Sequence, residues 1–309
     1  MNQVHDPENP YFSVVVPVYN RKELLLPALE SVMGQDHSSF EVILIDDGST
    51  DGTGDTIRMV YEKEERLRYV WQENAERGAA RNHGWQLARG RYVVFFDSDD
   101  RMEPDYLRAL ESAAHQSGEA GLLATHFCFL DLQGRKRASD VQRLPEGYYD
   151  YRLFLHGNPL ACNVAVRKDL HGFIPFENDR RYAVKEDWMF LISNTRHHQL
   201  YLLARTCLCM LDHPGRSMLA DHGKFIEKTR LATAWIIEHV ELNDQEKRVL
   251  QAHSEYIIAI HRYLEGSRKP AFKALFAAIR HSGLQLKYAT LFLKILAGRR
   301  LLLRLRERK

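Results

Sequence analysis

Short apolar runs alternate with amphipathic stretches between residues 12 and 130. The apolar runs are rich in β-branched and aromatic residues and predict strands at 12–18, 41–45, 68–71, 91–96 and 121–130. The stretches between them have helical spacing, at 22–35, 53–66, 78–89 and 104–117. Strands that alternate with helices predict an α/β domain with a mainly parallel sheet covered by helices on both faces.

The pattern changes twice after residue 130. Residues 131–220 mix aromatic residues with Gly and Pro, predict one helix near 186–197, and are expected to complete the same domain. From residue 221 the pattern is helical to the end, with breaks at 266–270 and at Gly283. We therefore expect an α/β domain at about 1–220 and a helical C-terminal region at about 221–309.

The composition is that of an ordinary soluble protein, with 45% hydrophobic and 27% charged residues among 309. This excludes a largely disordered chain and a multispan membrane protein. The four cysteines form no CxxC pair, which argues against a zinc ribbon or a disulfide scaffold and favours a reducing compartment. The first ten residues are polar and predict no signal peptide, so the expected location is cytoplasmic.

Acidic residues follow two of the predicted strands. Asp46 and Asp47 come after residues 42–45, and a DSDD segment at 97–100 follows residues 93–96. Because ligands of open α/β sheets bind outside the carboxyl ends of the strands, both clusters are expected at one crevice. Such residues also serve as turn and cap residues. However, three carboxylates within four residues repel one another unless a cation such as Mg²⁺ or Mn²⁺ lies among them.

A cation held by few carboxylates usually keeps open positions for substrate phosphates, so a nucleoside diphosphate is the expected partner. The chain has no GxxxxGK[ST] loop, which argues against ATP hydrolysis on that scaffold. The first strand is followed by Tyr-Asn at 19–20 instead of GxGxxG, which argues against NAD binding in the Rossmann manner.

Several segments in a fixed order resemble the family 2 glycosyltransferases of GT-A fold. They are FSVVVPVYN at 12–20, VILIDDGS at 42–49, GAARN at 78–82, YVVFFDSDD at 92–100, and more loosely KEDW at 185–188 and HPGRS at 213–217. The resemblance implies an inverting, metal-dependent enzyme. It would move a sugar from a nucleotide-sugar, expected to be a UDP-sugar, to a glycan or lipid-linked acceptor in cell-surface polysaccharide synthesis.

The resemblance also implies a nucleotide-binding set of residues. Pro17, Tyr19 and Asp47 would line the nucleoside pocket, with Asp47 hydrogen-bonded to the base. Asp46 would either bind there or support the loop. Arg81 would approach the nucleotide from the helix of the GAARN segment.

A second set would carry the chemistry. Asp97 and Asp99 match the DxD motif, with Asp99 as a ligand of Mn²⁺ or Mg²⁺ and Asp97 as a ribose contact or second ligand. His213 would supply a further metal or diphosphate contact, unless it is only a turn residue. Asp187 matches the catalytic base. Without the resemblance, the preferred explanation of Glu186 and Asp187 is that they are first-turn acids stabilised by the helix dipole.

Two other classes of protein remain open. A nucleotide-sugar-binding module without transfer activity would keep Asp47 and the DxD aspartates but lack a working base, and the presence of Asp187 argues against it. A nucleotidyltransferase would need a glycine-rich loop with Arg or Lys after the first strand. Residues 19–22 contain no glycine, which argues against this class.

The C-terminal end is strongly basic. Residues 268–309 contain twelve Lys and Arg but a single acid, Glu307. Four basic residues recur every seven positions and would share one helical face, at 273, 280, 287 and 294. A basic amphipathic helix suits an anionic membrane surface, so peripheral association with the inner face of the membrane is expected. The alternative is a helix docked on the domain. Nucleic acid is not an expected partner, because the basic residues lie at one end and the rest of the chain carries more acidic than basic residues.

Overall fold

The computed structural model describes residues 9–213 and 221–298. Two compact units are present in this part of the chain. One contains the residues up to 151 together with 159–213, and the other contains residues 152–158 and the helices that follow residue 220. The predicted domain boundary at about 220 adjoins residues 214–220, which lie outside the described part, and it stays a prediction.

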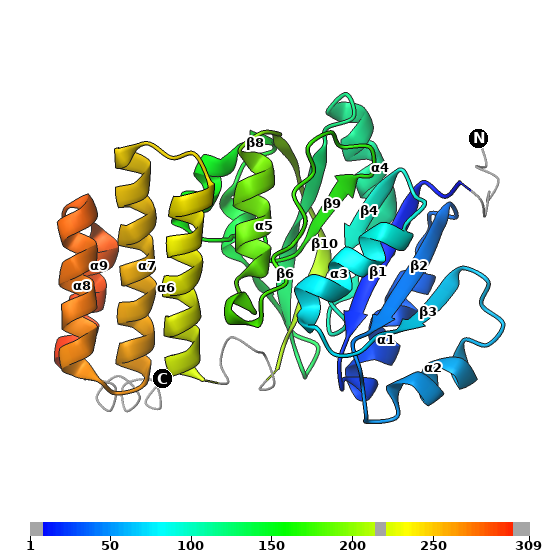
Figure 1. Ribbon diagram of the computed structural model, residues 1–309, viewed down its shortest axis with the longest axis horizontal. Coiled ribbons are helices and arrows are strands. Elements are labelled where there is room, and N and C mark those ends of the chain that lie inside the picture. The colour runs from blue at the N-terminus through cyan, green and yellow to red at the C-terminus, as the bar shows by residue number, and fades with distance from the viewer. Residues whose placement is uncertain (1–8, 214–220, 299–309) are drawn as a thin grey trace. The chain divides into compact units, whose positions relative to one another are not determined.

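The described residues of the first unit contain one mixed sheet (Figure 1). Its strands are β1 Phe12–Val18, β2 Phe40–Asp46, β3 Leu67–Trp71, β4 Tyr92–Phe95, β5 Arg101–Met102, β6 Leu122–Asp131, β7 Lys136–Ala138, β8 Gly147–Tyr149, β9 Val164–Arg167 and β10 Leu200–Asp212. The order is β3-β2-β1-β4-β9-β6-β10-β5, with β7 paired to β6 and β8 to β10. β1 to β4 are parallel, and β1 and β2 are buried along their whole length, as their continuous apolar runs predicted.

The helices of this unit pack against the sheet. They are α1 Lys22–Met33, α2 Thr53–Val60, α3 Glu76–Leu87, α4 Tyr106–Gln116 and α5 Glu186–Thr195. α3 packs on β1 and β2, where a Cβ at Gly84 would lie 2.3 Å from Cγ1 of Val15, so glycine permits the close approach. α2 ends before the predicted residue 66, because residues 61–66 are mostly charged and offer no apolar stripe to bury.

The segment from 131 to 213 contains strands that the sequence pattern did not predict. β9 runs antiparallel between β4 and β6, whereas β10 runs parallel to β6. The pairing of β10 shifts register between Leu203 and Leu208, and residues 204–206 between them are exposed. This interruption explains why the long strand shows neither clean alternation nor a continuous apolar run.

The second unit is helical, as predicted. Its long helices are α6 His222–His239, α7 Asp244–Leu264, α8 Arg268–Ser282 and α9 Leu286–Ala297. The chain breaks between α7 and α8 and at Gly283, which has φ 75°, close to the predicted breaks. A further break precedes α7, where Asn243 and Glu246 form a capping box. None of the described helices has both the length and the apolar character needed to cross a bilayer.

Candidate active site

The loops that carry the acidic clusters meet at one edge of the sheet. Val18 is the register partner of Asp46, and the amide of Asp47 donates to the carbonyl of Val18 at 2.9 Å. On the other side of β1, the amide of Phe96 donates to the carbonyl of Val15 at 3.0 Å. The predicted convergence of the two clusters is therefore confirmed.

Asp46 is part of the framework of this edge. Its Oδ1 accepts from the amide of Ser49 at 2.8 Å, and its Oδ2 accepts from the hydroxyl of Tyr69 at 2.6 Å. The side chain is buried. These contacts support the loop, which is the second of the two roles considered for Asp46.

Asp47 joins this edge to the loop after β3. Its Oδ1 accepts from Gln72 Nε2 at 2.7 Å and from the amide of Ala75 at 2.9 Å, while Oδ2 accepts from Asn74 Nδ2 at 3.1 Å. A carboxylate offers about four acceptor positions, so these three bonds leave one position for a hydrogen bond from the base of a nucleotide. The predicted hydrogen bond to the base stays a prediction. Sequence reasoning missed Gln72 and Asn74. Both follow the predicted strand at 68–71, so the tendency of ligand-binding residues to follow strand ends could have indicated them.

The remaining nucleoside residues lie at the end of β1. Pro17 is buried within the strand, and Tyr19 is largely exposed just after it. The ring of Tyr19 is 49% exposed, so core packing does not enclose it. The contacts predicted for both residues stay predictions.

Arg81 occupies an interior position that the sequence did not predict. Its side chain is almost completely buried, with Nη2 donating to Asp97 Oδ1 at 2.7 Å and Nη1 donating to Glu186 Oε1 at 3.0 Å. Although burial opposes the charge, the two carboxylates help to raise the pKa of Arg81 well above its usual value. The guanidinium therefore ties the DxD loop to α5, and its predicted nucleotide contact stays a prediction.

The second DxD aspartate lies between two cationic or potentially cationic side chains. Oδ2 of Asp99 accepts from Arg21 and lies 3.0 Å from Nε2 of His213, the residue after β10. Burial would raise the pKa of Asp97, but the charges of Arg81 and then Arg77 hold this pKa below its usual value. Sequence reasoning missed Arg21, because nothing local to residue 21 indicates a partner 78 residues away.

Asp99 and His213 offer a donor set that fits a divalent cation shared with substrate phosphates. Within residues 9–213 and 221–298, no three His, Cys, Asp or Glu side chains form a ready metal cluster. A cation that binds substrate phosphates needs only one or two protein ligands, and Mn²⁺ accepts both carboxylate and imidazole. The fit requires Arg21 to move off Oδ2 of Asp99, since that oxygen is the one nearest His213.

Asp187 lies in the first turn of α5, next to Glu186, which accepts a hydrogen bond from Arg81. Its Oδ1 accepts from the amide of Trp188 at 2.8 Å. Burial, followed by the charge of Glu186, raises the pKa of Asp187 to about 6. A carboxylate with a pKa closer to neutrality is a more effective proton acceptor than an ordinary aspartate. Val184, just before this turn, has φ 68°, an unfavourable backbone for a β-branched residue and one that is often found at functional sites.

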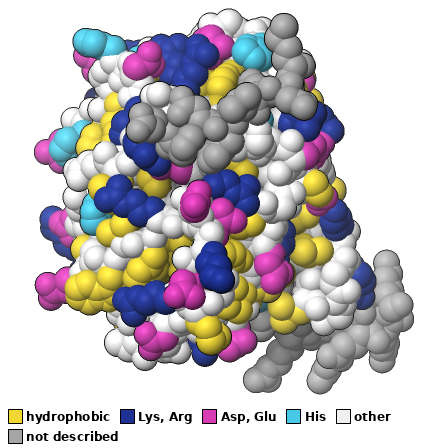
Figure 2. All heavy atoms as spheres, turned by 90° about the vertical axis from the view of Figure 1, so that its right-hand side faces the viewer, with side chains coloured by type: hydrophobic (Ala, Val, Ile, Leu, Met, Phe, Trp, Pro, Cys, Tyr) yellow, Lys and Arg dark blue, Asp and Glu magenta, His cyan; other side chains and the backbone are white. Residues whose placement is uncertain are grey.

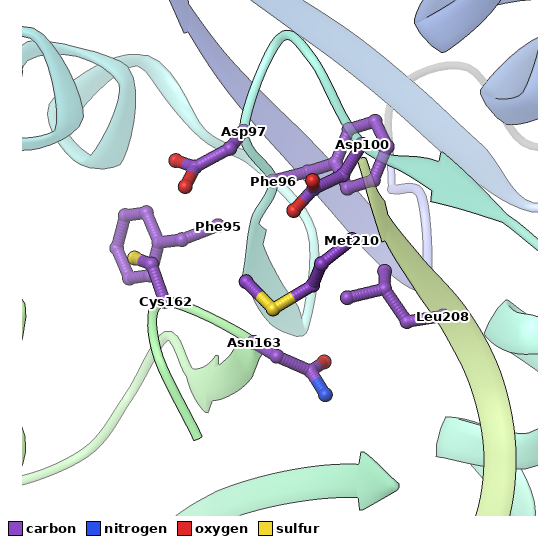
Figure 3. Close-up of a pocket in the computed structure, with 8 residues that line it drawn as sticks. All are labelled: Phe95, Phe96, Asp97, Asp100, Cys162, Asn163, Leu208 and Met210. Carbon is purple, nitrogen blue, oxygen red and sulfur yellow. The ribbon is translucent and has the colours of Figure 1, made fainter. Parts of the chain in front are cut away.

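A small pocket lies below the DxD loop (Figure 3). Asp97 and Asp100 contribute its carboxylates, whereas the other lining residues are Phe95, Phe96, Cys162, Asn163, Leu208 and Met210. Asn163 is held by its own bonds, since its Nδ2 donates to the carbonyl of Thr125 and its Oδ1 accepts from the hydroxyl of Tyr106. The lining is mostly apolar. Burial of the Cys162 thiol raises its pKa well above the usual value, because a thiolate is poorly solvated there.

Comparison with known proteins identifies the family. Residues 13–168 match the model of glycosyl transferase family 2. Glycosyltransferase GlyG of Streptococcus pneumoniae is 31% identical over 245 residues, which cover 74% of this chain and 77% of the relative. The matches to the first curated relatives are shorter, and this chain spans only 14% to 44% of their length.

Solved structures show the same fold. TarS residues 1–349 of S. aureus in complex with UDP-GlcNAc superimpose with a TM-score of 0.65 at 21% identity, covering 87% of this chain and 81% of that one. Mannosyltransferase PcManGT of Pyrobaculum calidifontis, in complex with GDP-Man and Mn²⁺, gives a TM-score of 0.56 at 21% identity, covering 94% and 81%. These likenesses confirm the predicted GT-A fold. Together with the family match, they establish that the chain belongs to glycosyl transferase family 2.

Proposed function

We propose that the protein is an inverting, metal-dependent glycosyltransferase that uses a UDP-sugar. The observation that carries the proposal is the bridge made by Arg81, which joins Asp97 of the DxD motif to Glu186, the neighbour of Asp187. The bridge couples a donor-binding loop to a candidate base. UDP-GlcNAc in TarS and GDP-Man with Mn²⁺ in PcManGT support a nucleotide-sugar donor and a divalent cation.

In the proposed reaction, the carboxylate of Asp187 accepts the proton of an acceptor hydroxyl. The hydroxyl oxygen forms a bond to the anomeric carbon, and the bond from that carbon to the diphosphate oxygen breaks with its electron pair. One base opposite the leaving group gives a single displacement, and therefore inversion. A bound Mn²⁺ or Mg²⁺ would supply Lewis-acid neutralisation of the charge on the diphosphate. Asp99 and His213 would hold this ion, and Asp97, positioned by Arg81, would contact the ribose or serve as another ligand.

The proposed acceptor is a glycan or a lipid-linked sugar of a cell-surface polysaccharide. We place the enzyme in the cytoplasm, as a peripheral protein on the inner face of the membrane, where a lipid-linked acceptor would be within reach. The apolar and basic surface of the C-terminal helices supports this location.

A donor panel tests the proposal. UDP-, GDP- and dTDP-sugars are incubated with the protein and Mn²⁺, and nucleotide binding and slow release of nucleoside diphosphate are measured. Release of UDP from one UDP-sugar is the expected result. Binding without release, also in the presence of candidate acceptors, would indicate a binding module. Release of pyrophosphate from a nucleoside triphosphate and a sugar phosphate would indicate a nucleotidyltransferase.

Metal binding gives a separate prediction. Asp99→Asn is expected to weaken Mn²⁺ affinity in the presence of UDP by at least about tenfold, because it removes a charged ligand. Arg21→Ala is expected to strengthen the affinity by about three- to tenfold, because it removes the cation that competes for Oδ2 of Asp99. Titration of Mn²⁺ followed by electron paramagnetic resonance measures both. Asp131→Asn, at the last residue of β6, is the control. An Asp99→Asn protein with wild-type Mn²⁺ affinity would exclude Asp99 as a ligand.

The raised pKa of Asp187 predicts the pH dependence of transfer. The base must be ionised, so kcat/KM should fall about tenfold per pH unit below about pH 6 and level off above it. Glu186→Gln removes the neighbouring negative charge that raises the pKa of Asp187, and the inflection should then move to lower pH. A pH profile with an unchanged inflection in Glu186→Gln would assign the titration to another group.

A further inference from the structure

The outward side of the α8–α9 pair carries an apolar band. α8 and α9 pack side by side (Figure 1), and their inward residues, including Leu275, Tyr288 and Ile295, form a buried core. Other large apolar side chains of the pair remain exposed. The band consists of Phe272, Phe276, Leu284, Leu286, Phe292, Leu293 and Leu296, all of which are exposed or partly buried.

The band is continuous across the two helices. Rings of Phe272 and Phe276 on α8 lie 5.2 and 6.3 Å from the ring of Phe292 on α9. Leu286 and Leu293 are seven residues apart, so they lie on the same outward side of α9. A soluble monomer has no reason to keep such a run of Phe and Leu in water, which marks the band as a contact surface.

Basic side chains border the band on both helices. Lys269, Lys273 and Arg280 are exposed on α8, and Lys294 is exposed on α9. The single basic stripe predicted from the seven-residue spacing is wrong, because Gly283 ends α8 and divides the basic residues between two helices. Each of the two helices that carry the apolar band therefore has exposed basic residues of its own.

The charge on this part of the chain has one sign. No Asp or Glu occurs between residues 266 and 306. Other parts of the surface carry charges of both signs: on the face shown in Figure 2, Lys and Arg are interspersed with Asp and Glu. An apolar band with a purely basic border is typical of helices that lie in the interface of an anionic membrane.

Other occupants of the band would bring like charges together. A second copy of the α8–α9 surface would place its own Lys and Arg against the basic border. Residues 299–309, outside the described part, contain six basic residues and one acid and would meet the same repulsion. Anionic lipid headgroups complement the border instead.

We propose that the outward side of α8 and α9 docks on an anionic lipid surface. The Phe and Leu side chains of the band enter the boundary between headgroups and acyl chains, while the basic border binds lipid phosphates. This proposal concerns the helical unit alone and does not depend on glycosyl transfer.

Cosedimentation of the full chain with vesicles tests the proposal. Vesicles of phosphatidylcholine are compared with vesicles that also contain phosphatidylglycerol, at low and high salt. Leu293→Asp is the test variant, since Leu293 is 64% exposed and its replacement should not disturb the core. Leu132→Asp is the matched control, because Leu132 is 60% exposed in the other unit.

The wild type and Leu132→Asp should bind anionic vesicles, more weakly at high salt, and bind phosphatidylcholine little. Leu293→Asp should bind at least about tenfold more weakly, because it puts a negative charge where the leucine would enter the lipid surface. Full binding by Leu293→Asp, or equal binding of the wild type to both vesicles, overturns the proposal. So does a dimer in vesicle-free solution that Leu293→Asp dissociates. UDP release without vesicles is measured in parallel, and its failure would count against the enzyme assignment but not against docking.

Discussion

Asp187→Asn is expected to lower kcat by about 10²–10⁴-fold, the usual contribution of a general base. Asparagine has nearly the same shape but cannot take a proton from the acceptor hydroxyl. Affinity for UDP should remain close to that of the wild type, because Asp187 would act on the acceptor side of the reaction. Steady-state transfer and calorimetric titration with UDP measure the two effects.

Asp244→Asn provides a control for this experiment. Asp244 is also a first-turn helix carboxylate, but it begins α7 in the helical unit. If first-turn acids affected turnover only by stabilising a helix through its dipole, Asp244→Asn and Asp187→Asn should have similar effects. We expect Asp244→Asn to leave turnover unchanged. Wild-type turnover in Asp187→Asn would show that another group is the base. Loss of UDP binding together with turnover would show that the variant damages the donor site.

Arg81→Met is expected to lower the free energy of unfolding by about 3–5 kcal/mol, the usual effect of removing one partner of a buried ion pair. Glu186 would then be buried without its closest cation, and Asp97 would lose the contact that holds its carboxylate. The pKa of Asp187 should also rise further, because the charge of Arg81 helps to lower it. Urea unfolding measures stability, and the acid limb of kcat/KM measures the change in pKa.

Two further variants test whether the loss of stability comes from the buried ion pairs of Arg81 and not simply from removing an arginine. Arg58→Met removes an exposed ion pair with Asp55 on α2 and should change stability far less. Combining Arg81→Met with Glu186→Gln should recover part of the lost stability, because a neutral amide then replaces the unpaired buried carboxylate of Glu186. Equal destabilisation by Arg58→Met and Arg81→Met would show that the buried bridge does not support the site.

The first four parallel strands could be predicted because each has a strong local signal. Buried strands need continuous apolar runs, and the acidic residues that follow them lie at the same sheet edge by geometry alone. β10 could not be predicted in this way, since its exposed residues 204–206 break the apolar run and its pairing with β6 joins residues far apart in the chain.

The sequence by itself determined the family, the strand-end aspartates Asp47, Asp97 and Asp99, and the basic character of the C-terminal helices. These properties depend on residue type and on neighbours within a few positions. Only the tertiary structure decided that Arg81 is buried between Asp97 and Glu186, and that Arg21 and His213 meet on one oxygen of Asp99. Charges are paired by distance in space, and partners separated by 16 to 114 positions leave no local pattern in the chain.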